Sequence, residues 1–300
     1  MPKAVLTTKV DPSYDDLPEE RYHFPRTYLN AARAAIGDWI VYYEPRRSSS
    51  HLSSSGGRQS YFATARIVRV DGDPLRSDHY YAYVADYLEF DRPVPFREDG
   101  FFYESRLQKA DGSVNKGLFG RSVRLLQDAE YSMILAAGFE TAVAQHERFG
   151  VREGFHPDPG GLELTDRPIV ERLSRRPFRD RVFSTGIKRA YDNTCAISGL
   201  RIINGGGRAE TQAAHIRPVH ANGPDSLRNG VALSSTFHWM FDRGLISIDD
   251  DYSLLFNRNA VPANVLSLVN RDGRLRVPQQ EIYQPHRRFL EYHREHVFKG

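Results

Sequence analysis

Residues 195–250 have the sequence CAISGLRIINGGGRAETQAAHIRPVHANGPDSLRNGVALSSTFHWMFDRGLISIDD, and this stretch decides how the second half of the chain folds. Residues 209–216 predict a strand that ends at His215, and residues 231–234 predict a short second strand after a polar loop. Residues 235–244 predict a helix that ends at a glycine. The candidate N-caps of this helix are Ser234, Ser235 and Thr236. The stretch therefore predicts two strands followed by a helix.

The spacing of the polar side chains in this stretch points to a specific chemistry. Thirteen residues separate His215 from Asn229, and eight separate Asn229 from His238. Asp242 follows His238 by four positions, so both side chains share one face of the predicted helix. Two strands and a helix can direct both histidines to one spot. One imidazole can then take a proton from water while the other holds a cation against a phosphate.

This pattern, with AHI at the first histidine and FDRG after the second, resembles the HNH endonucleases, whose fold is a ββα-metal finger. It is most similar to the branch whose members often carry a modified-base reader in front. The resemblance covers about residues 170–298. It implies that His215 is the general base, that Asn229 braces the main chain around it, and that His238 binds the metal. It also implies Mg²⁺ or another divalent cation, and double-stranded DNA as the partner.

Two features depart from the family pattern. Many HNH enzymes have a metal-binding Asp or His directly before the base, where this chain has Ala214, which cannot bind a metal. Asp242 falls where many members place a second ligand on the helix, and we expect it to bind the ion. Some members also clamp a structural zinc with four cysteines. The corresponding positions here are Cys195, Ser198, Ser234 and Phe237.

Because Cys195 is the only cysteine of the chain, a four-cysteine zinc site is excluded. Apolar packing must then brace the finger. The candidate side chains for this packing are Ile197, Leu200, Ile202, Leu233 and Phe237.

The first half of the chain predicts strands at residues 39–44, 61–70 and 79–90, separated by turns, as in a small β-barrel or sandwich. The segments FPRTYL, GDWIVYYEPRR and YFATARIVRV resemble the PUA-like group, especially EVE-type domains. That resemblance implies an aromatic pocket that holds a flipped, modified base. The candidate pocket residues are Trp39, Tyr43, Asn115 and Phe119. For each of Trp39 and Tyr43, a place in the core of a β-barrel is the favoured alternative.

Length and charge suggest two domains. The 300 residues, of which 40% are apolar and 26% charged, exclude a fibre or a disordered chain. Residues 1–160 carry 20 Lys+Arg and 23 Asp+Glu, whereas residues 161–300 carry 21 and 15. The first half is therefore slightly acidic and the second half basic. We predict an α+β protein, whose parts are a PUA-like β-barrel domain at 1–149, a linker at 150–166, and an HNH domain with flanking helices at 167–300.

The basic half begins with a predicted helix that is rich in cations. Its candidate contacts to DNA phosphates are Arg175, Arg176, Arg179, Lys188 and Arg189. A solvated helix face is the ordinary alternative.

The sequence thus predicts a restriction-type endonuclease directed at DNA with modified bases. One finger cuts one strand, so a double-strand break requires a homodimer or two binding events. No apolar run approaches the ~20 residues of a membrane span, and we expect a cytoplasmic bacterial protein. Two alternatives stay open. One is a phage-defence nuclease whose first domain senses a partner or a nucleotide, and the other is a catalytically inactive DNA-binding protein.

Overall fold

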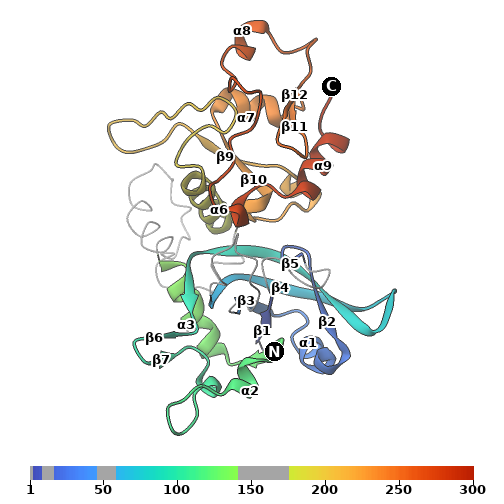
Figure 1. Ribbon diagram of the computed structural model, residues 1–300, viewed down its shortest axis with the longest axis vertical. Helices are drawn as coiled ribbons and strands as arrows, with labels where there is room; N and C mark the ends of the chain where they lie inside the picture. Colours follow the sequence, from blue (N-terminus) through green and yellow to red (C-terminus); the bar gives the residue numbers. More distant parts are fainter. Residues whose placement is uncertain (1–2, 9–16, 46–58, 141–175) are drawn as a thin grey trace, which may run out of the picture. The chain divides into compact units, whose positions relative to one another are not determined.

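The computed structural model divides the chain into two compact units, Met1–Arg179 and Asp180–Gly300 (Figure 1). The predicted linker lies outside the described residues, so the predicted domain boundaries stay a prediction. No helix within the described ranges is long and apolar enough to cross a bilayer. The structure describes residues 3–8, 17–45, 59–140 and 176–300.

The first unit is built on a six-stranded sheet with the order β2-β5-β4-β3-β1-β8. The pair β1 and β3 is parallel, and the other neighbours are antiparallel. Among the described strands β2 and β8 are the edges, and the sheet forms a curled half-barrel. The strands are β1 (Lys3–Thr7), β2 (Arg21–Pro25), β3 (Trp39–Glu44), β4 (Ser60–Asp73), β5 (Arg76–Pro95) and β8 (Val123–Leu126).

Alternation along the strands sorts their side chains onto two faces. On β3, Ile40 and Tyr42 are buried in one apolar cluster with Phe62 of β4, and α1 (Leu29–Ala34) adds Ala32 to it. Short elements follow β5: the two-stranded ribbon of β6 (Arg97–Glu98) and β7 (Phe101–Phe102), then η2 (Ser105–Leu107) and α2 (Lys116–Phe119). Helix α3 (Asp128–Gly138) closes the described part of this unit and packs on β4 and β5.

The second unit contains the predicted strand, strand and helix. Strand β9 (Gln212–His215) pairs antiparallel with β10 (Gly230–Leu233), and α7 (Ser235–Asp242) follows at once. Ser234 occupies the N-cap position of α7. The helix α6 (Arg176–Ala190) precedes this ββα element. The elements after it are β11 (Ile246–Ile248), β12 (Leu254–Phe256), α8 (Ala263–Leu266) and α9 (Arg287–His296). The α+β fold class is confirmed.

Apolar packing braces the ββα element. Cys195, Ile197 and Leu233 are buried in one cluster with Phe237, as expected. Leu200 and Ile202 are not part of it, and that part of the prediction is wrong. Their exposed fractions are 43% and 53%, because residues 200–210 form an outward loop closed by the bridge between Ile203 and Ala209.

Candidate active site

His215 is the last residue of β9, and its imidazole is held from two sides. The ring of Phe183 on α6 stacks on it, with 3.9 Å between ring centroids and 13° between the planes. Its Nε2 lies 2.9 Å from Oδ1 of Asp225. Across the hairpin, His215 pairs with Gly230, where a Cβ would lie 2.3 Å from Cδ1 of Ile187. A glycine at this position therefore lets α6 approach the hairpin closely enough to place Phe183.

Asn229 is fully buried and ties the end of β9 to the loop before β10. Its Oδ1 accepts from the N–H of Arg217 at 2.8 Å. Its Nδ2 donates to the carbonyl of Arg217 at 3.0 Å and to the carbonyl of Pro224 at 2.9 Å. Both the oxygen and the nitrogen of the amide thus bond main-chain groups around the base, which is the geometry that a bracing role requires.

His238 and Asp242 lie one turn apart on α7, with 3.4 Å between Nε2 of the histidine and Oδ2 of the carboxylate. On the other edge of the imidazole, Nδ1 lies 2.7 Å from Oε1 of Gln212. The amide nitrogen of Gln212 meets the hydroxyl of Ser235 at 3.1 Å, which is consistent with its oxygen facing His238. Because an amide oxygen only accepts, the proton of His238 belongs on Nδ1, and the Nε2 lone pair points toward Asp242.

His215, His238 and Asp242 line one cleft, whose volume is about 490 Å³. His220, Arg243 and His293 line it as well, so four imidazoles and one guanidinium share its walls with Asp242 and five apolar residues. His220 and Arg243 are exposed. Such a surface suits the negative charge of a phosphodiester backbone.

The donor atoms in the cleft fit a divalent cation in part. Nε2 of His238 and Oδ2 of Asp242 are a nitrogen and an oxygen ligand, and neighbouring ligands of one such ion lie about 3 Å apart. Ala214 is buried in the core and offers no donor. Among the described residues, no group of three or more His, Cys, Asp or Glu side chains is placed to hold a metal. Two protein ligands therefore fit, and water and phosphate must supply the others.

The predicted phosphate-contacting cations lie on α6, apart from Arg175, which is outside the described residues. Arg176 is partly exposed, and the guanidinium of Arg179 forms an ion pair with Asp86. Arg189 is exposed. Burial, and then the nearby Arg208, lower the pKa of Lys188. Arg189 is thus the most open of the described candidates, while Arg179 is engaged within the protein.

The four candidate pocket residues of the first unit have different environments, and only Tyr43 and Phe119 form a ring contact with each other. Trp39 is buried, and its main-chain N–H donates to Asp38. Tyr43 is also buried and meets Phe119 edge to face, at a centroid distance of 5.4 Å. Burial raises the pKa of the Tyr43 phenol, whose oxygen has no hydrogen-bond partner among the described residues. Asn115 caps α2 by accepting from the N–H of Leu118.

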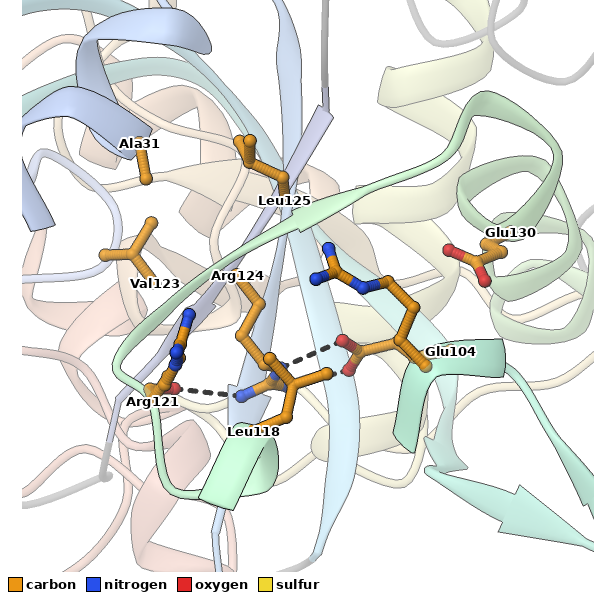
Figure 2. A pocket seen from close by; sticks show the side chains of 9 residues that line it. Ala31, Glu104, Leu118, Arg121, Val123, Arg124, Leu125 and Glu130 are labelled. Carbon is orange, nitrogen blue, oxygen red and sulfur yellow. Dashed lines mark hydrogen bonds and ion pairs between the residues drawn. The ribbon is translucent and has the colours of Figure 1, made fainter. Parts of the chain in front are cut away.

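The neighbouring cavity of this unit is lined by other side chains. Figure 2 shows Arg124 turned toward Glu104, with which it forms a buried two-pronged ion pair of 2.7 and 2.9 Å. The hydroxyl of Tyr61 donates to the same carboxylate at 2.7 Å. The cavity has a volume of about 260 Å³, and none of the four candidate pocket residues lines it. Arg124 and Glu104 of this cavity therefore already have hydrogen-bond partners within the protein.

The sequence interpretation missed three side chains that contact the two histidines of the cleft: Asp225, Gln212 and Phe183. Asp225 lies in the loop that was interpreted only as polar, four residues before Asn229. A carboxylate in the loop that joins the two strands was the available signal. No comparable signal marks Gln212 or Phe183.

Comparison with known proteins identifies the domain. A family model described as HNH endonuclease (HNH_2) matches residues 195–249. No curated protein matches the chain. Solved structures also match, at low identity and low TM-score. The modification-dependent TagI restriction endonuclease is 15% identical, with 98% of this chain and 81% of that chain covered and a TM-score of 0.31.

Two more of the similar structures match about half of this chain. The N-terminal domain of Staphylothermus marinus McrB is 11% identical over 45% of this chain and 93% of that chain, with a TM-score of 0.30. The protein Rpa0253 from Rhodopseudomonas palustris is 16% identical over 52% of this chain and 98% of that chain, with a TM-score of 0.32. The family match, which contains the whole ββα element, carries the identification: the chain has an HNH endonuclease domain.

Proposed function

We propose that the protein is a metal-dependent DNA endonuclease of the restriction type, directed at DNA with modified bases. The observation that carries the nuclease part is the cleft that brings His215, His238 and Asp242 together within the HNH domain. In the reaction, the imidazole of His215 takes a proton from water, and the resulting hydroxide attacks phosphorus in line with the leaving 3′ oxygen. Asn229 keeps the main chain around the base in place.

His238 and Asp242 would hold the divalent cation, Mg²⁺ or a related ion. When bound, such an ion stabilises the negative charge that develops on the phosphate and on the leaving oxygen. Gln212 supports this role because it directs the Nε2 lone pair of His238 toward the carboxylate. Exposed cations such as Arg189 would grip the DNA backbone.

A plasmid-nicking assay tests the nuclease. Wild-type protein with Mg²⁺ or Mn²⁺ should convert supercoiled plasmid that carries modified bases to the open circle, and EDTA should stop it. His215→Ala and His238→Ala should abolish nicking, and His215→Ala should keep DNA binding. His296→Ala is the matched control, because His296 is an exposed histidine of the same unit that does not line the cleft. Normal nicking by His215→Ala would refute the assigned base.

The substrate class needs its own experiment. We propose that the first unit, which resembles EVE-type domains in sequence, selects the modified base, while the basic second half holds the duplex. Cleavage of DNAs that carry 5-methylcytosine, 5-hydroxymethylcytosine or N6-methyladenine should exceed cleavage of the same plain DNA. Equal cleavage of all substrates would favour the defence nuclease, and no cleavage of any would favour the inactive DNA-binding protein.

Among the candidate pocket residues, Phe119 gives the clearest test of whether the first unit recognises a modified base. It is only half-buried, whereas Trp39 and Tyr43 are buried in the fold. Phe119→Ala should therefore reduce discrimination between modified and plain DNA without unfolding the unit. Phe101→Ala is the control, because Phe101 is an aromatic residue of the same unit with an exposed fraction of 50%. A double-strand break would further require two copies of the finger, which analytical ultracentrifugation on DNA can count.

A further inference from the structure

The two nitrogens of His215 have different surroundings. Nε2 lies 2.9 Å from Oδ1 of Asp225. Nδ1 has no hydrogen bond to any described residue, and it is not among the buried polar atoms that lack a partner. Solvent therefore reaches Nδ1, and the imidazole lines the cleft in which the phosphodiester would lie. A general base must present its lone pair on the accessible nitrogen.

Asp225 can enforce this arrangement because its side chain is fully buried, whereas that of His215 is 16% exposed. An ionised carboxylate only accepts hydrogen bonds, so its contact with Nε2 requires that the proton of neutral imidazole be on Nε2. We propose that Asp225 is the positioning residue of the base: it accepts the Nε2–H hydrogen bond of His215 and thereby keeps the Nδ1 lone pair directed at water. This inference rests on the proposed nuclease function.

The loop between the strands is built to return Asp225 to the base. Asn222 has a φ of 61°, which turns the chain in the left-handed region. At Gly223 a Cβ would lie 1.8 Å from the carbonyl oxygen of Arg217, so only glycine permits the loop to close onto the end of β9. The amide of Asn229 then holds the carbonyl of Pro224, directly before Asp225. The bracing bonds of Asn229 and the position of the carboxylate are thus parts of one arrangement.

The imidazole of His215 is also held from above one face of its ring. Phe183 covers one face of the imidazole, at a centroid distance of 3.9 Å, so the ring cannot turn away from Asp225 without losing this stack. When the imidazole takes the proton of water, the carboxylate stabilises the new positive charge. The other titratable and charged side chains that line the cleft are His220, His238, Asp242, Arg243 and His293. Asp225 differs from them in its direct hydrogen bond to the base.

The first test measures the tautomer and needs no cleavage. In protein labelled with ¹⁵N-histidine, long-range ¹H–¹⁵N spectra distinguish a protonated from an unprotonated ring nitrogen, and His215→Ala assigns the signal. We expect neutral His215 to be protonated on Nε2 in the wild type. Protonation on Nδ1 would overturn the proposal. This readout separates a failure of the positioning role from a failure of the nuclease function, because it is independent of activity.

The second test uses Asp225→Asn, which keeps the shape of the side chain and removes its charge. We expect kcat to fall by roughly 10²–10⁴, as for orienting carboxylates of other catalytic histidines, with KM for DNA little changed. Asp251→Asn, at an exposed aspartate of the same unit, is the control. Wild-type kcat in Asp225→Asn would overturn the proposal, and a melting curve confirms that the variant is folded.

Discussion

Replacing Asn229 with alanine tests whether the active-site loop depends on one buried amide. The side chain makes three hydrogen bonds, two to the main chain of Arg217 and one to that of Pro224. A net hydrogen bond contributes about 1 kcal/mol, so Asn229→Ala should lower the free energy of unfolding by about 3 kcal/mol. For a unit of this size, about 4 °C per kcal/mol gives a fall in Tm of about 12 °C. Differential scanning calorimetry of the full chain measures it.

Two further variants make this prediction specific. Asn229→Asp keeps the acceptor for the N–H of Arg217, but it turns an oxygen toward two carbonyls that Nδ2 now satisfies. It should therefore be at least as destabilising as alanine, although its volume is almost unchanged. Asn264→Ala is the control at an exposed position of α8 and should leave Tm within about 1–2 °C, the range of neutral surface changes. A melting temperature of Asn229→Asp close to the wild-type value would refute the reasoning.

Burial lowers the pKa of His293 to about 4, so between that value and 6.5 the unfolded chain binds more protons than the folded one. Stability should fall by up to about 3 kcal/mol as the pH drops from 7 to 4, and His293→Gln should flatten this dependence in urea titrations. Gly223→Ala should unfold the loop or displace it, because its Cβ would meet the carbonyl of Arg217, and both Tm and nicking should fall. Arg124→Met leaves the buried Glu104 unpaired and should destabilise the first unit by about 3–5 kcal/mol, with partial recovery in the double variant with Glu104→Gln.

Local signals in the sequence were sufficient for the ββα element. The polar loop and the glycine at its end bound the two short strands, and the apolar spacing after Ser234 defines α7. The strand predicted at residues 39–44 is β3 itself, because its first five residues are all aromatic or β-branched. These features depend on neighbours within a few positions, which a single sequence displays directly.

Burial and long-range contacts were harder to predict. Leu200 and Ile202 are apolar but exposed, because the outward loop that carries them has no regular period from which a buried face could be inferred. The strand order of the half-barrel is set by pairings between distant segments, which a single sequence does not display. The aromatic residues Trp39 and Tyr43 are buried, and composition alone does not separate a pocket lining from a core.

The absence of a zinc clamp links the core of the second unit to its chemistry. Where other members of the family hold the finger with four thiolates, this chain packs α6 against it. Ile187 of α6 lies so close to Gly230 that any larger side chain at position 230 would clash with it. One turn away on the same helix, Phe183 belongs to this core and also stacks on the imidazole of His215. The packing that replaces the metal clamp therefore also orients the base. The apolar core and the catalytic geometry of this finger cannot vary independently, because the same ring belongs to both.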